Sequence, residues 1–341
     1  ERTSAEVKGA TLLGTHYRLV SPAGEGRLPD DTIPAARTRV PFNLQDVIDE
    51  LGLGNPGDWN WDRFADAAKA ITEKKPGLAG YTMALGRNLC ADYHITQFIW
   101  QAGGMTWDPA DRFKTVFDSA ATVEAFDFIK RLNAYMQRAA IEFSFLQVVD
   151  QHVTGRTAMS AYWGRTMGRA AEEAKPIFEK MEYYLNPAHP RTGGRWSWTD
   201  INGWIIPARD NPFIKEVKEA VAYVSNSVEW MVRYSQSLMP NVGPVFKAVA
   251  SAPAMLAHPF YQSKKRTLDV IFQQSVPHAC NTGLELKKGV NPLAGFAHGR
   301  SVWAQAVQRM LLNNDSPKAA VEWGHRQFES VRRDNQRLLA G

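Results

Sequence analysis

The clearest periodicity in the chain lies between residues 60 and 74. Apolar side chains there recur at the i, i+3, i+4, i+7 spacing of one buried helix face, and they are Trp61, Phe64, Ala65, Ala68 and Ile71. Asn60 can cap this helix, and Asp62 favours its positive N-terminal end. Comparable patterns predict helices at about 92–101, 118–136, 166–180, 213–237, 300–313 and 316–339.

Short apolar runs between these segments predict β-strands. They lie at 81–85, 157–162, around 183–185 and at 204–206. Residues 1–58 are rich in Pro and Gly, so we expect irregular structure there apart from a short strand end at Val40-Pro41-Phe42. Short strands that alternate with longer helices indicate an α/β protein in which helix dominates.

Length and composition narrow the class of protein. A chain of 341 residues exceeds one ordinary domain, which predicts two compact units. Hydrophobic residues make up 44% and charged residues 22%, which is typical of a soluble globular chain. No apolar run approaches the roughly 20 residues that a membrane span needs. The opening Glu1-Arg2-Thr3-Ser4 is polar, so we expect that any signal peptide was removed or never included.

Charge and cysteine usage exclude several kinds of site. The net charge is +5, but the basic residues are scattered, which argues against nucleic-acid binding. Histidine spacing predicts no metal site, and no motif predicts a cofactor. Cys90 and Cys280 either form one disulfide that closes a long loop or remain two buried thiols.

Tryptophan is the informative residue type, because the chain has 11 of them. An indole ring can stack on the apolar face of a sugar ring, but it is also a large core side chain. The position of each tryptophan therefore decides between a ligand contact and a core role.

Six phrases in order along the chain point to a known family. They are Asn60-Trp61-Asp62-Arg63-Phe64, Phe98-Ile99-Trp100-Gln101-Ala102-Gly103-Gly104, Phe117-Asp118-Ser119 with Val123-Glu124-Ala125-Phe126, Gly155-Arg156-Thr157-Ala158-Met159 with Trp163, Asn202-Gly203-Trp204-Ile205-Ile206-Pro207, and Leu238-Met239-Pro240-Asn241. Together they resemble the extracellular solute-binding proteins of bacterial ABC carbohydrate importers, the family that includes maltose-binding protein.

The resemblance implies a periplasmic-binding-protein-like α/β fold, in which two α/β lobes are joined by crossing strands around a cleft. We expect residues 1–45 and 206–270 to form the N-terminal-type lobe, and 46–205 with 271–341 to form the C-terminal-type lobe. The family has a longer strand-and-helix segment before its Val-Pro segment than residues 1–39 provide here. We therefore expect either that the N-terminal lobe is incomplete in this chain or that this region is unusual for the family.

The resemblance also implies which residues bind a ligand in the cleft. The candidates are Asn43, Asp92, Tyr93, Trp163, Arg165, Asn202, Trp204 and Trp303. The three tryptophans would stack on the sugar or else belong to the core, and Asp92 would accept sugar hydroxyls or else cap a helix. The amide of Asn202 could both accept from and donate to vicinal hydroxyls, and Arg165 could face an anionic group or lie on the surface. Trp61 and Trp100 fit core positions and are excluded.

The function implied is capture of a sugar or polyol and its delivery to an ABC permease, by a protein that is not an enzyme. We expect a monomer, located in the periplasm or outside the cell. The alternative is a saccharide-processing enzyme with a catalytic carboxylate pair such as Asp92 and Asp200. A sensor or scaffold that uses the same ligand trap is a third class, and the sequence does not distinguish it.

Overall fold

The fold is described from a computed structural model, over residues 4–11, 14–21, 38–39, 44–111, 113–162, 164–200, 203–206, 211–287 and 291–335. The strands are β1 Ser4–Thr11, β2 Gly14–Ser21, β3 Thr38–Arg39, β4 Ala79–Thr82, β5 Thr157–Ser160, β6 Ser197–Trp198 and β7 Ala279–Cys280. The helices are α1 Leu44–Leu51, α2 Trp61–Lys74, α3 Leu89–Gln101, α4 Ala120–Asn133, α5 Phe145–Val153, α6 Gly164–Glu173, α7 Lys175–Lys180, α8 Ile214–Asn226, α9 Val228–Leu238, α10 Lys247–Ala250, α11 Pro253–Leu256, α12 Pro259–Asp269, α13 Ala294–Gly299, α14 Val302–Leu312 and α15 Pro317–Asp334.

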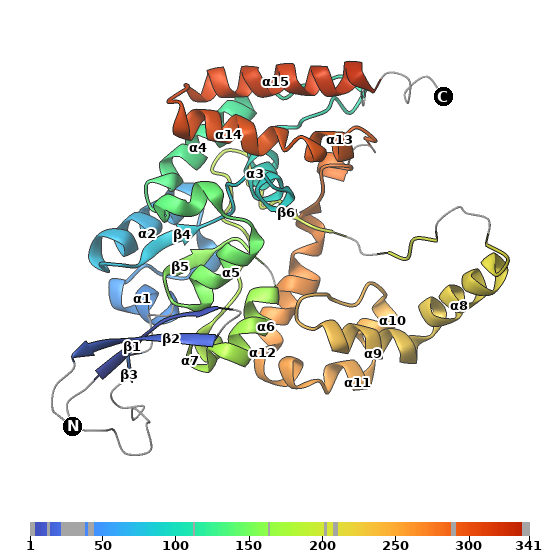
Figure 1. Ribbon diagram of the computed structural model, residues 1–341, viewed down its shortest axis with the longest axis horizontal. Coiled ribbons are helices and arrows are strands. Elements are labelled where there is room, and N and C mark those ends of the chain that lie inside the picture. Colours follow the sequence, from blue (N-terminus) through green and yellow to red (C-terminus); the bar gives the residue numbers. More distant parts are fainter. Residues whose placement is uncertain are drawn as a thin grey trace.

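The main body of the molecule is built around the parallel pair β4–β5, in which Tyr81 lies opposite Met159. Figure 1 shows α2 and α5 beside this pair, and α3, α4, α14 and α15 stacked beyond it. Helix α2 approaches β4 closely, because Gly80 lies against the backbone of Ala68. The apolar side chains between these layers form the largest core cluster, which includes Ile71, Phe126 and other buried residues from 47 to 331.

The predicted start of α2 is confirmed in detail. The side chain of Asn60 accepts a hydrogen bond from the Arg63 backbone N–H at 2.9 Å, and the five apolar residues of the predicted face are all buried. Ser119 and Ser316 cap α4 and α15 in the same way. These caps satisfy N–H groups that a helix leaves unpaired in its first turn.

Two smaller apolar clusters lie outside the main core. One joins α5, α6 and α7 and includes Val149, Met167 and Ile177. The other joins α9 to α12 and includes Val232 and Leu268. Helix α8 extends away from the rest (Figure 1), and none of its side chains is buried. The predicted division into two lobes at residues 45, 205 and 270 stays a prediction.

Several predicted elements were wrong. The region expected to be irregular contains an antiparallel hairpin, β1–β2, whose register places Ala5 opposite Leu19 and Val7 opposite Tyr17. Residues 183–185 and 204–206 form no strand. Instead, β6 at Ser197–Trp198 pairs in parallel with β7. A two-residue strand gives too short an alternation to be recognised before its partner is known.

Two long predicted helices are each divided in two. The 166–180 helix breaks at Ala174, two residues before Pro176, which cannot donate within a helix interior. The 213–237 helix breaks at Ser227, whose side chain accepts from the Trp230 backbone N–H and so caps α9. A serine at this position competes with helix continuation through its own hydroxyl.

Candidate functional site

The carboxyl ends of β4 and β5 point to the same edge of the sheet because the two strands are parallel. β4 leads through residues 83–88 into α3, and β5 leads through residues 161–163 into α6. In open parallel sheets, ligands bind outside the carboxyl ends of the strands. The N-terminal ends of α3 and α6 therefore mark the edge at which a ligand site is expected.

Aromatic side chains gather at this edge. The ring of Tyr162, which follows β5, stacks against Phe145 with centroids 6.3 Å apart, and it meets His94 edge-on. Burial lowers the pKa of His94 to about 3, and its Nδ1 accepts from the Ala84 N–H at 2.9 Å. The imidazole is therefore neutral and holds the loop after β4 in place. Arg165 is exposed at the start of α6, with its guanidinium 5.2 Å from the Phe145 ring centroid.

A second aromatic group includes Tyr93, the α3 residue that precedes His94. Tyr93 stacks on Trp198, the last residue of β6, with ring centroids 3.9 Å apart and an angle of 18° between the planes. Both side chains are half-buried. Burial raises the pKa of Tyr93 to about 12, and the negative charge of Asp200 acts in the same direction. We call Tyr93 and Trp198 the aromatic platform. It presents apolar ring surface beside a carboxylate.

Trp198 was not predicted as a site residue. Its backbone N–H donates to Gln97 Oε1 at 3.3 Å, and the Asn186 amide donates to that same oxygen at 3.0 Å. The bond from Trp198 attaches β6 to α3, and Trp198 lies over Tyr93. The only signal in the sequence was Trp196-Ser197-Trp198, in which alternate positions face the same side of a strand.

Asp92 lies next to the platform but is wholly buried, so the prediction that it contacts sugar hydroxyls was wrong. Its Oδ2 pairs with His298 Nδ1 at 2.9 Å, and its Oδ1 accepts from the Ala304 N–H at 2.9 Å. The alternative of a helix cap was also wrong, because Asn88 caps α3. Burial raises the pKa of Asp92, and the bonds from His298 and Ala304 oppose that rise.

Trp303 is a core residue rather than a ligand contact. Its side chain is fully buried, and Nε1 donates to Thr106 Oγ1 at 3.0 Å. The core positions expected for Trp61 and Trp100 are confirmed, since both are buried. Trp303 followed the helical period of α14, and on that ground alone a core role was the better expectation.

Trp204 is 59% exposed and leans on Tyr234, with ring centroids 6.1 Å apart. Asn43, Trp163 and Asn202 lie outside the described residues. The structure thus brings Tyr93 together with Trp198, and it places Arg165 beside Phe145. The proposed ligand contacts of the other exposed or undescribed candidates stay predictions.

The two cysteines do not form a disulfide. Cys90 Sγ lies 3.8 Å from His94 Nε2, and Cys280 Sγ accepts from the Leu286 N–H at 3.0 Å. Burial raises the pKa of both thiols to about 12. Of the two alternatives left open by the sequence, the structure has the buried thiols.

A buried carboxyl group, Glu285, joins the turn after β7 to the main core. Its Oε2 accepts from the backbone N–H groups of Thr106 and Trp107 at 2.7 and 3.0 Å, and its Oε1 accepts from Trp100 Nε1 at 3.2 Å. Burial raises its pKa from 4.5 to about 7. These donors hold the side chain even though it lies in the protein interior.

The raised pKa of Glu285 predicts a pH dependence of stability. Between pH 4.5 and 7 the folded protein keeps a proton that the unfolded chain has released. The free energy of unfolding should therefore fall by about 3 kcal/mol as pH rises through that window, and be unaffected by this group above it. Urea unfolding of the wild type and Glu285→Gln at pH 4.5 and 7.5 measures this difference. The same pH dependence in both proteins would contradict it.

In the part of the chain that the structure describes, no three His, Cys, Asp or Glu side chains are grouped so that they could hold a metal ion. Over the same residues, no helix combines the length and apolar character needed to cross a bilayer.

The comparisons with known proteins establish the family. Several solved structures share this fold. One is an ABC transporter solute-binding protein from Thermotoga lettingae with bound α-D-tagatose, at a TM-score of 0.67 and 20% identity over 85% of this chain and 69% of that chain. A T. maritima protein with bound maltose matches with a TM-score of 0.68 and 17% identity, over 84% of this chain and 69% of that chain. A solute-binding protein from Agrobacterium radiobacter K84 in complex with ribitol matches with a TM-score of 0.64 and 17% identity, over 84% of this chain and 68% of that chain.

These similarities identify the fold as that of the periplasmic solute-binding proteins, an α/β architecture, as the sequence predicted. The family model described as bacterial extracellular solute-binding protein matches residues 23–229, which is more than half of the chain. The chain therefore belongs to the bacterial extracellular solute-binding protein family. No curated protein sequence matches it.

Proposed function

We propose that this protein binds a sugar or polyol against the Tyr93–Trp198 platform and delivers it to an ABC permease. The observation that carries the proposal is the half-buried stacked pair at the carboxyl end of β6, in a member of a solute-binding family. Neighbouring structures of the same fold hold tagatose, maltose and ribitol. An aromatic ring offers such a ligand an apolar face, and polar groups at its rim select the hydroxyls.

Asp200 supports this assignment, because it follows the platform by two residues and its charge acts on Tyr93. A carboxylate accepts hydrogen bonds from hydroxyl groups and repels anions. We therefore propose a neutral sugar or polyol rather than a sugar acid. Trp163, Asn202, Asn43, Arg165 and Trp204 remain proposed contacts from the sequence resemblance alone.

Binding is proposed to work by capture between two lobes. A ligand shifts the equilibrium toward a closed form only by its greater affinity for that form. Closure around the platform would bury the polar partners of the sugar hydroxyls, and a solute that leaves those partners unpaired would bind less tightly. We propose that the permease recognises the closed form.

The family consists of solute-binding proteins rather than enzymes. We propose that this chain likewise performs no turnover. A glycosidase needs a carboxyl group that can reach the substrate, but both oxygens of Asp92 are engaged inside the protein. This engagement argues against the Asp92–Asp200 pair as a catalytic pair. A monomer in the periplasm or outside the cell, without a nucleic-acid partner, completes the proposal.

A thermal-shift screen tests the binding function. A sugar or polyol present at 100 times its Kd should stabilise the protein by about 2.7 kcal/mol and raise Tm by about 4 °C. The panel should contain neutral sugars, polyols, oligosaccharides and sugar acids, with chromogenic glycosides added as a test of turnover. Stabilisation by sugar acids alone, or release of the chromophore, would contradict the proposal.

A further inference from the structure

Four rings form a continuous row from the core to the surface. Trp303, which is fully buried, lies against His298 with ring centroids 4.7 Å apart. His298 meets Tyr93 edge-on at 5.1 Å and an angle of 73°, and Tyr93 stacks on Trp198 at 3.9 Å. The outer two rings are the platform, so the orientation of the His298 ring determines the surface against which Tyr93 rests.

Hydrogen bonds hold both nitrogens of His298. Nδ1 bonds Asp92 Oδ2 at 2.9 Å, and Nε2 bonds Thr282 Oγ1 at 2.6 Å. Asp92 is wholly buried, Thr282 is 4% exposed and the imidazole 12%. With Asp92 Oδ2 accepting from the N–H at Nδ1, the threonine hydroxyl completes the bonding of the ring at Nε2. A ring bonded at both nitrogens cannot turn without breaking one bond.

Asp92 is itself fixed from a third element. Its second oxygen accepts from the Ala304 N–H at the start of α14, while Thr282 lies in the turn after β7. The bonds thus join α3 to the 281–284 turn, α13 and α14. Asp92 is 206 positions from His298 and 212 from Ala304 in the sequence. Neither Asp92 nor Thr282 is exposed enough to contact a solute.

We infer that Asp92 and Thr282 are positioning residues for the solute site: through His298 they set the orientation of Tyr93 and hence the Tyr93–Trp198 stack. The inference rests on the proposed role of that stack in binding. The bonded imidazole is more than a space-filler, because a ring of the same shape without its two bonds could tilt between Trp303 and Tyr93. A tilted ring would let Tyr93 leave the plane in which it meets Trp198.

Thr282→Val tests the inference with little change in volume. The variant should weaken binding of the best sugar from the thermal-shift panel about tenfold, since one buried hydrogen bond is lost and the ring beneath Tyr93 is released. Thr282→Ser restores the hydroxyl and should bind like the wild type. Thr157→Val is the matched control: Thr157 is similarly buried, and its hydroxyl bonds the backbone carbonyl oxygens of Ala79 and Met159.

The near-ultraviolet circular dichroism of the ligand-free protein gives a second readout. The contribution of the stack is the difference between the wild type and Trp198→Ala. Thr282→Val and His298→Phe should lose most of that contribution, while Thr282→Ser and Thr157→Val keep it. His298→Phe retains a ring in the row but forms neither hydrogen bond, so it separates positioning from filling of space.

Two results would overturn the inference. One is an unchanged stack signal in a folded Thr282→Val and in His298→Phe. The other is an equal loss in Thr157→Val, which would reveal general destabilisation. If no sugar binds the wild type, the binding function fails, and the ligand-free spectra still decide whether His298 orients the stack.

Discussion

Gly80→Ala should unfold the protein or remove more than about 3 kcal/mol of its stability, which is a large part of the 5–15 kcal/mol typical of a domain. Gly80 lies in β4, where α2 crosses it. A Cβ atom at this position would lie 2.0 Å from the carbonyl oxygen of Ala68 and 2.6 Å from its carbonyl carbon. Both are backbone atoms, so no side chain can rotate away, and α2 would have to move off the strand.

Urea denaturation followed by circular dichroism measures the effect, or the yield of soluble protein does so if the variant fails to fold. Gly295→Ala is the matched control. Gly295 lies in α13, and an added Cβ would meet nothing within 4 Å. Alanine is the better helix former, so the control should gain about 0.5–1 kcal/mol. A Gly80→Ala variant as stable as the wild type would contradict the close approach of α2 to β4.

Trp198→Ala should weaken sugar binding by about 10- to 100-fold, which is about 1.4–2.8 kcal/mol. The substitution removes one of the two rings of the platform and leaves Tyr93 without its stacking partner. Trp198 is only half-buried, so the fold should persist and the loss should appear in affinity. Isothermal titration with the best sugar of the panel measures Kd.

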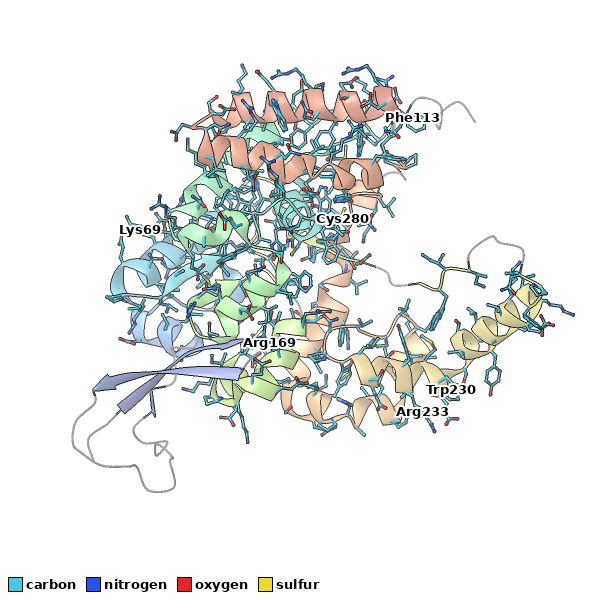
Figure 2. The ribbon with its side chains drawn as sticks, in the orientation of Figure 1. Lys69, Phe113, Arg169, Trp230, Arg233 and Cys280 are labelled. Atoms are coloured by element: carbon cyan, nitrogen blue, oxygen red, sulfur yellow. The ribbon has the colours of Figure 1, made fainter. Side chains whose placement is uncertain are left out.

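Trp230→Ala controls for the loss of a tryptophan as such. Trp230 is 46% exposed on α9 and contacts the guanidinium of Arg233. Figure 2 shows both residues on the helical segment that projects from the main body, away from Cys280. The affinity of the Trp230→Ala variant for the sugar should equal that of the wild type. An unchanged Kd in Trp198→Ala would remove the platform from the binding site, and an equal loss in both variants would point to an effect on the whole fold.

The fold was predicted best where local signals agreed. For α2, the cap at Asn60 and the apolar face to Ile71 pointed to the same helix, and tertiary packing only confirmed it. The β1–β2 hairpin was missed because its apolar residues are few. Each strand is defined by its antiparallel pairing with the other, and the sequence of one strand alone does not show this pairing. The break at Ser227 was missed because apolar periodicity continues across it, while the serine hydroxyl terminates one helix and caps the next.

The site was predicted less well, for a physical reason. Tyr93 was identified from a family-like position, but Trp198 becomes its partner only through bonds that join residues about 100 positions apart. Asp92 and Trp303 were likewise assigned to ligand binding from their positions in the family resemblance. Burial excludes that role for Asp92, because both of its oxygens are bonded inside the protein. Its carboxylate instead holds His298, which lies beneath Tyr93. Long-range pairing such as Asp92–His298 leaves no local pattern.

The buried thiols have a practical consequence for measuring solute binding. A thiol reacts as its thiolate, and a pKa of about 12 leaves Cys90 and Cys280 almost wholly protonated near neutrality. Both side chains are also shielded from reagent. A cysteine introduced on an exposed helix such as α8 would therefore take up a maleimide dye selectively, with the native cysteines left in place. The wild-type chain is thus ready for fluorescent reporting of solute capture without a cysteine-free background.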